Sequence, residues 1–195
     1  MKYLLSIFLC LVSSMALAQD SASLLKQYAQ QISEVKTLQS DFTEEKHLSL
    51  LSTPLESKGK LSFDKTAQQL HWQYQTPFQK GFLMEKEHVY RLQGNEKTLI
   101  QDALGKMMAA QMLVWLTLDF ETLQKEYQIA LNQEEITFTP RAKDHKVVKQ
   151  ITVWLDKDNV QQVRQVKMEE PSGDFVLWKF SNTRVNKPLD QEALP

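Results

Sequence analysis

The segment from Pro54 to Pro77 reads PLESKGKLSFDKTAQQLHWQYQTP, and it decides the fold. Apolar residues recur at every second position on each side of its central DKTAQQ, namely at Leu61, Phe63, Leu70, Trp72 and Tyr74. The residues between them are polar, so the segment predicts two β-strands with one apolar face and one wet face. A curved sheet of this kind either packs its own apolar side chains together or keeps a hollow. We interpret the hollow as the functional feature.

Further segments with a period of two lie on both sides of this stretch. A strand is expected before it from about residue 38 to 45, and shorter ones after it over 81–86 and 88–92. Later strands are expected over 127–131, 135–139, 147–155, 160–168 and 174–180. About ten to eleven strands in one small chain favour a mainly β, α+β fold, an incomplete antiparallel β-barrel.

Two segments have helical spacing instead. The first spans 23–36, and the second spans 101–124 as two short helices broken near 117–119. The second carries Met108, Met112 and Trp115 on one face. Methionine adapts to apolar partners of varied shape, so this helix is interpreted as a lid over an apolar cavity. Ordinary core packing of the same stripe is the alternative.

The candidate lipid-binding residues are the apolar side chains expected on the concave face of the sheet and on the lid. They are Phe42, Leu61, Phe63, Leu70, Trp72, Tyr74, Phe82, Met84, Met108, Met112, Trp115 and Phe138. Lys65 is expected at the lid and rim, in a basic group with Lys58, Lys60 and Lys80 that would meet an anionic head group. A role in solubility alone is the alternative for these lysines.

Composition and motifs argue against catalysis and against the binding of nucleotides, nucleic acids or metals. The five glycines are too far apart for a phosphate-binding loop, and the net charge of −1 does not favour nucleic acid. No histidine has metal-ligand or catalytic spacing. Adjacent acids such as Glu44 and Glu45 point to opposite faces of a strand, so they are read as solvated charges. We expect no enzyme activity, no catalytic residue, no cofactor and no metal.

The first eighteen residues have the pattern of a cleavable signal peptide. Lys2 precedes an apolar run over 3–12, and Ala16-Leu17-Ala18 has the small residues of a cleavage site. Removal of 1–18 also removes the single cysteine, which excludes disulfides and lipid attachment through cysteine. We expect residues 19–195 to form one periplasmic domain.

The ordered set of strand sequences resembles a known family. The segments Leu38-Gln39-Ser40-Asp41-Phe42, Gly59-Lys60-Leu61-Ser62-Phe63 and Leu70-His71-Trp72-Gln73-Tyr74, followed by Ile136-Thr137-Phe138-Thr139-Pro140, are similar to those of the outer-membrane lipoprotein carrier family, LolA. The resemblance implies an unclosed barrel with a helical lid, which shields acyl chains and passes them from an inner-membrane donor to an outer-membrane acceptor. Lys65 or Thr66 lies where the family has an arginine thought to hold the lid shut.

The resemblance leaves the cargo and the role open in part. The segment 51–59 looks closer to divergent members of the family, so the cargo is an acylated lipoprotein, a glycolipid or an acylated pigment. We expect a monomer that binds no nucleic acid and moves its cargo toward the outer membrane. The alternative is a regulatory module that uses the same half-barrel to sense lipids or lipoproteins.

Overall fold

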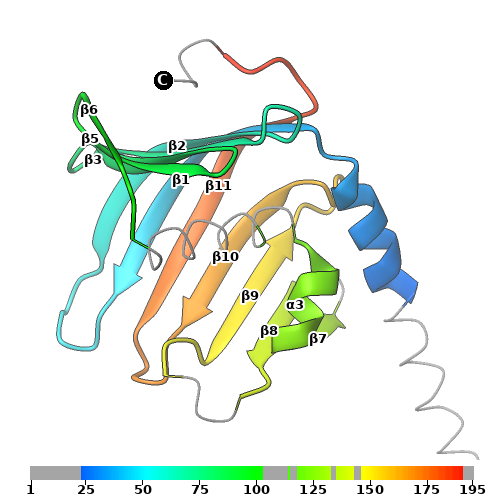
Figure 1. Cartoon of the computed structure of the whole chain (residues 1–195). Coiled ribbons are helices and arrows are strands. Elements are labelled where there is room, and N and C mark those ends of the chain that lie inside the picture. Colours follow the sequence, from blue (N-terminus) through cyan, green and yellow to red (C-terminus); the bar gives the residue numbers. More distant parts are fainter. Residues whose placement is uncertain (1–22, 103–113, 115–117, 133–134, 143–145, 191–195) are drawn as a thin grey trace, which may run out of the picture.

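The computed structural model describes residues 23–102, 114, 118–132, 135–142 and 146–190, and these contain eleven strands (Figure 1). The strands of the first half are β1 (Thr37–His47), β2 (Leu55–Asp64), β3 (Gln69–Thr76), β4 (Lys80–Glu85), β5 (His88–Gln93) and β6 (Glu96–Leu99). Those of the second half are β7 (Tyr127–Asn132), β8 (Glu135–Pro140), β9 (Gln150–Leu155), β10 (Val163–Glu169) and β11 (Phe175–Val185).

All ten strands expected from the sequence are present among the described residues, with ends that differ by a few residues. The strand β6 was missed, because its four residues are all exposed and carry no apolar alternation. The strand β9 begins at Gln150 and not at residue 147, whereas β11 continues to Val185. The local sequence pattern thus predicts where a strand forms, whereas the residues at which it begins and ends depend on the strands that it pairs with.

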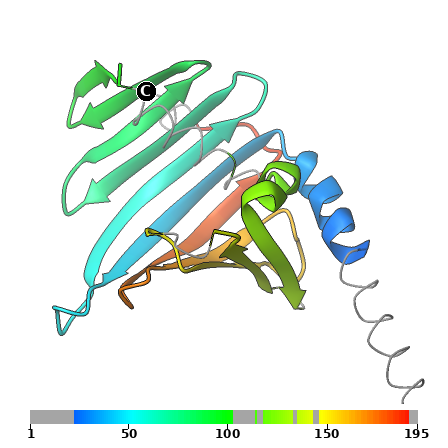
Figure 2. The same cartoon turned by 60° about the horizontal axis from the view of Figure 1, so that its bottom comes forward.

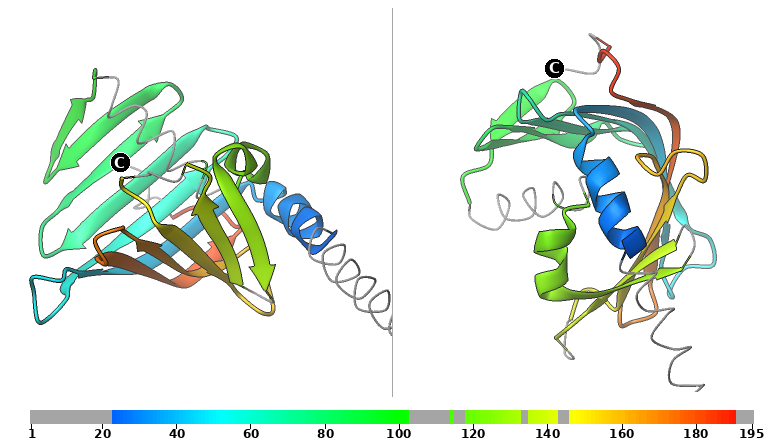
Figure 3. Two further views of the ribbon diagram at one scale, coloured as in Figure 1. Left: turned by 90° about the horizontal axis from the view of Figure 1, so that it is seen from below. Right: turned by 90° about the vertical axis from the view of Figure 1, so that its right-hand side faces the viewer.

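The strands form a single antiparallel sheet that is not closed into a barrel. Its order is β6-β5-β4-β3-β2-β1-β11-β10-β9-β8-β7, so each half is a meander and the two halves meet where β1 pairs with β11. The sheet curls strongly, with the helix α3 (Phe120–Glu126) on its concave side and the N-terminal helix of residues 23–33 at one end of the strands (Figures 2 and 3). The fold is therefore the incomplete barrel that the strand count predicts.

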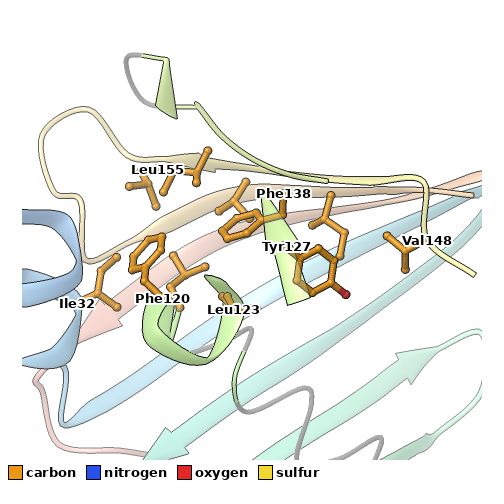
Figure 4. Close-up of a cluster of buried hydrophobic side chains, with 11 residues drawn as sticks. Ile32, Phe120, Leu123, Tyr127, Phe138, Val148 and Leu155 are labelled. Carbon is orange, nitrogen blue, oxygen red and sulfur yellow. The ribbon is translucent and has the colours of Figure 1, made fainter. Parts of the chain in front are cut away.

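The interior of the curl contains two separate hydrophobic clusters. The first half of the sheet carries the buried residues Phe42, Leu61, Phe63, Leu70, Trp72, Met84 and Val89. The second half packs against the helices through Ile32, Leu118, Phe120, Leu123, Tyr127, Ile136, Phe138, Val148, Ile151, Val153 and Leu155 (Figure 4). Each Å² of apolar surface removed from water contributes about 25 cal/mol to the free energy of folding. Each cluster therefore stabilises its own half of the sheet.

The predicted helical segment 101–124 is described only in part. The helix α3 begins after Asp119, whose side chain accepts a hydrogen bond from the backbone N–H of Thr122 at 3.1 Å. Leu118 just before it has a φ of +43°, so no α-helix continues through this residue. Met108, Met112 and Trp115 lie outside the described residues, and the lid that they define remains a prediction.

Candidate binding cavity

A cavity of about 720 Å³ lies between the two halves of the sheet. Its walls come from both hydrophobic clusters, from the N-terminal helix and from the start of α3. The apolar residues of its lining include Ile32, Leu38, Leu61, Phe63, Leu70, Trp72, Met84, Leu118, Phe120, Ile151, Val153, Val166, Met168, Trp178 and Phe180. A hollow of this size and character takes an apolar molecule.

The structure places the candidate residues in three different positions. Five of them line the cavity, and these are Leu61, Phe63, Leu70, Trp72 and Met84. Phe42, Tyr74 and Phe82 pack beside that wall and are not part of the lining. Phe138 is fully buried under α3, against Phe120 and Tyr127, so it belongs to the core of the second half (Figure 4).

The opposite wall was missed by the sequence reasoning. It consists mainly of half-buried residues of β10 and β11, among them Val166, Met168, Trp178 and Phe180. Their alternation with polar residues was visible in the sequence. What was not visible is that β11 pairs with β1, with Phe180 opposite Phe42, because these residues are far apart in the chain.

An aromatic layer lies behind the cavity wall on the first half of the sheet, and of its rings only Trp72 lines the cavity. The ring of Phe42, which is 1% exposed, lies 4.5 Å from Trp72 and 5.2 Å from Tyr74, measured between ring centroids. Phe42 is paired with Gly59 on β2, and a Cβ at Gly59 would lie only 2.4 Å from its Cζ. The absence of a side chain at Gly59 is therefore what lets the Phe42 ring approach the backbone of β2 at this position.

One carboxylate lies on the same face of β1 as Phe42. The Oε2 atom of Glu44 accepts hydrogen bonds from the Tyr74 hydroxyl at 2.6 Å and from Trp178 Nε1 at 2.8 Å. Its neighbour Glu45 points the other way and pairs with Lys179 at 2.5 Å. The sequence interpretation of both acids as solvated is thus wrong for Glu44, which shares the parity of Phe42 along the strand.

The Tyr74 hydroxyl is a fixed donor in this arrangement. Burial raises the pKa of Tyr74 above its ordinary value, and the hydrogen bond to Glu44 raises it further. The side chains of Trp72 and Trp178 act on this pKa in the opposite direction through their N–H groups, so both indoles lie near the hydroxyl. Tyr74 therefore stays protonated even at alkaline pH values where a free tyrosine begins to ionise, and its hydroxyl keeps donating to Glu44.

Lys65 lies at the rim of the cavity, where it contacts the N-terminal helix. Its Nζ donates to the carbonyl oxygen of Ser33 at 2.8 Å, in the last turn of that helix. Two other side chains bind the same helix end: Gln161 donates to the Gln31 carbonyl at 2.8 Å, and Asn186 accepts from the Lys36 N–H at 2.7 Å. The helix and the residues that follow it are thus attached to the residues just after β2 and β11 and to the loop before β10.

The arrangement is suited to binding. Within the described ranges, no three histidine, cysteine or acidic side chains are grouped so that they could hold a metal ion. No helix in that part of the chain has the length and apolar character needed to span a membrane. A curved sheet around an apolar cavity defines a class of proteins that bind hydrophobic ligands.

The comparison with known families agrees with this class. Residues 33–193 match the family described as "Outer membrane lipoprotein carrier protein LolA", so the chain belongs to the LolA family. The resemblance seen in the sequence is therefore confirmed. No match was found among curated proteins by sequence.

Solved structures with low sequence identity share the fold. MucB superposes with a TM-score of 0.58 at 13% identity, covering 91% of this chain and 62% of that chain. The MucA/MucB complex of Pseudomonas aeruginosa gives 0.55 at 14% identity, with 89% and 59% covered. The lipoprotein LppX of Mycobacterium tuberculosis gives 0.50 at 11% identity, with 85% and 94% covered. This chain thus spans about three-fifths of the length of the first two chains.

Proposed function

We propose that this protein is a periplasmic carrier that encloses the acyl chains of a lipoprotein or glycolipid and moves them toward the outer membrane. The observation that carries the proposal is the apolar cavity of about 720 Å³, with walls from both halves of an open sheet. Each methylene withdrawn from water contributes about 0.8 kcal/mol, so one acyl chain binds well without polar contacts. The exported form would be the single domain of residues 19–195, after cleavage of 1–18.

Transfer between a donor and an acceptor requires transient contacts, and the loops at one end of the sheet offer them. Leu50 in the β1–β2 loop is 94% exposed, and Phe78 in the β3–β4 loop is 72% exposed. Both loops lie at the same end of the antiparallel strands, together with the exposed Val147 before β9. Large exposed apolar side chains gathered at one end are typical of an interaction surface.

The binding of acyl chains is tested by ligand uptake with a matched pair of variants. Phe180→Asp places a charge in the cavity wall, whereas Leu177→Asp places it on the same strand, outside the cavity lining. Both residues are half-buried, so their effects on folding are comparable. We expect Phe180→Asp to abolish uptake of a fluorescent fatty acid and Leu177→Asp to retain it. Protein from the periplasm that carries no lipid in native mass spectrometry, and takes up no probe, would refute the proposal.

The second candidate is a regulatory module that binds a protein partner. The similarity to MucB, solved in a complex with MucA, favours it. This role predicts a stable protein complex in affinity purification from the periplasm, whereas a carrier predicts only transient contacts. The two candidates share the cavity and differ in the lifetime of the protein contact.

A further inference from the structure

The exposed large apolar side chains of the described residues gather at one end of the sheet. Of six such side chains, five lie at the end where β1 finishes and β2 begins, and these are Leu50, Leu51, Leu55, Phe78 and Val147. The sixth, Leu99 at the end of β6, pairs with Tyr90 near the start of β5 and so lies toward the opposite end. Figure 2 shows the β1–β2 and β3–β4 loops at the same end of the strands, away from the N-terminal helix. Single exposed apolar residues are ordinary, whereas a group at one place indicates a contact surface.

Hydrogen bonds hold the β1–β2 loop in a fixed shape. The Ser49 N–H donates to Asp174 Oδ1 at 2.7 Å, and the Leu51 N–H donates to the Leu48 carbonyl oxygen at 2.9 Å. Leu50 lies between these two attachments and is nevertheless 94% exposed. The backbone of this loop therefore holds the leucine side chain out in water.

The other two apolar side chains of this surface are held outward in a similar way. Phe78 is 72% exposed, and the Gln79 carbonyl oxygen beside it accepts a hydrogen bond from the Gly94 N–H at 3.0 Å. Val147 is 61% exposed, whereas the next residue, Val148, is buried in the hydrophobic cluster of the second half of the sheet. We call Leu50, Phe78 and Val147 the apolar tips.

Exposed lysines lie next to two of the apolar tips. Lys80 follows Phe78 by two residues, and Lys146 and Lys149 flank Val147. Within the described ranges, none of these three lysines forms an ion pair. A lysine beside an inserted apolar side chain keeps its methylene groups in the apolar layer and extends its ammonium group to lipid phosphates.

Acidic residues at the same end weaken this attraction without cancelling the apolar character. Glu170 and Asp174 lie in the β10–β11 turn, and Asp174 already accepts the Ser49 N–H. That turn carries none of the exposed large apolar side chains. The apolar tips should therefore supply most of the affinity for a partner, and the lysines should add a preference for negative charge.

We propose that the apolar tips dock this end of the sheet on the surface of a lipid bilayer, with the neighbouring lysines on anionic head groups. A bilayer accepts apolar side chains from separate loops and needs no fitted groove, since its affinity follows the apolar area inserted and the charge. A protein interface needs a closely packed complementary centre, which three separate tips do not offer. The apolar tips are not part of the cavity lining, so docking leaves the cavity available. The inference rests on the proposed carrier function for its purpose, which is to bring the loaded carrier to a membrane.

Cosedimentation of residues 19–195 with vesicles, without added cargo, tests the inference. Vesicles of phosphatidylcholine alone are compared with vesicles that contain roughly a quarter phosphatidylglycerol. We expect binding to both, at least about fivefold tighter on the anionic vesicles, which is the factor for one lysine near an anionic surface. High salt should remove that preference and leave the binding to phosphatidylcholine unchanged.

Variants of exposed residues separate the apolar tips from the lysines. Leu50→Ser and Phe78→Ser should each weaken vesicle binding about tenfold, the factor for one large apolar side chain withdrawn from water. Leu99→Ser is the matched control, because Leu99 is also exposed and lies toward the opposite end of the strands. Lys149→Gln should weaken binding to the anionic vesicles alone. All four side chains are exposed, so Tm should stay close to that of the wild type.

The outcomes distinguish this inference from the proposed function. A wild-type protein that takes up a fluorescent fatty acid and binds neither kind of vesicle would overturn the membrane inference and leave the carrier function standing. The apolar tips would then serve a protein contact. Vesicle binding that is unchanged in Leu50→Ser and Phe78→Ser, or equally weakened in Leu99→Ser, would also overturn the inference. Vesicle binding by a protein that takes up no fatty acid would instead refute the carrier function and support the docking surface.

Discussion

Replacement of Gly59 by alanine should destabilise the protein, because the new methyl group has no room. The added Cβ would lie 2.2 Å from the Gln73 carbonyl oxygen and 2.4 Å from Cζ of Phe42. Nonbonded carbon atoms prefer about 3.5–4.0 Å, so the Phe42 ring must move by more than about 1 Å, and β3 must also shift. Overpacking of a core costs about 1–3 kcal/mol, and the backbone contact adds to it, so we expect a loss of roughly 2–4 kcal/mol.

Thermal unfolding followed by tryptophan fluorescence and circular dichroism measures this loss. For a chain of this length, the expected loss lowers Tm by about 5–15 °C. Gly94→Ala is the control, since nothing lies within 4 Å of its Cβ and only its φ of +58° opposes the substitution, at about 1–2 kcal/mol. In a Phe42→Leu background Gly59→Ala should lose about 1 kcal/mol less, because the ring contact is gone. A Gly59→Ala protein within 0.5 kcal/mol of the wild type would refute the reasoning.

Three further predictions concern Lys65 at the rim, Leu50 in the β1–β2 loop and the buried Tyr74. Lys65→Met removes the hydrogen bond to Ser33, so amide hydrogen exchange in residues 23–33 should become about five- to tenfold faster. Unchanged exchange would show that Lys65 does not attach the helix. Leu50→Asp should leave Tm and fatty-acid uptake unchanged and slow delivery of cargo to outer-membrane vesicles, and full delivery would exclude this loop as a docking site. Because the pKa of Tyr74 is raised in the folded protein, its contribution to stability is fully present below pH 10 and is lost as the pH rises above that value. Alkaline unfolding monitored through tyrosinate absorbance should therefore shift in Tyr74→Phe, and an identical profile would contradict this cause.

The alternation of inner and outer side chains along each strand was the most informative sequence signal. It was not applied to Glu44. The rule that placed Phe42 on the inner face also places Glu44 there, since the two residues are two apart on β1. The acid was nevertheless taken as solvated because it is charged. The structure shows that Tyr74 and Trp178 provide the hydrogen bonds that let a carboxylate face inward.

The alternation of inner and outer side chains could not distinguish residues that line the cavity from residues that belong to a packed core. Phe63 and Phe138 have the same kind of local pattern, and only the first lines the cavity. The difference arises because α3 packs over Phe138 through Phe120, whereas nothing from the second cluster fills the space beside Phe63. Contacts between segments distant in the chain decide this.

The sequence by itself determined ten of the eleven strands of the described residues and the apolar character of the first cavity wall, because these depend on alternation over a few consecutive residues. The ordered set of strand sequences indicated the family. Only the tertiary structure decided the second wall, the attachment of the N-terminal helix and the hydrogen bonds that Glu44 accepts from Tyr74 and Trp178. These depend on the pairing of β1 with β11, which places Glu44 opposite Trp178, 134 residues away. Such pairing is set by the free energy of the whole curled sheet, and no local pattern records it.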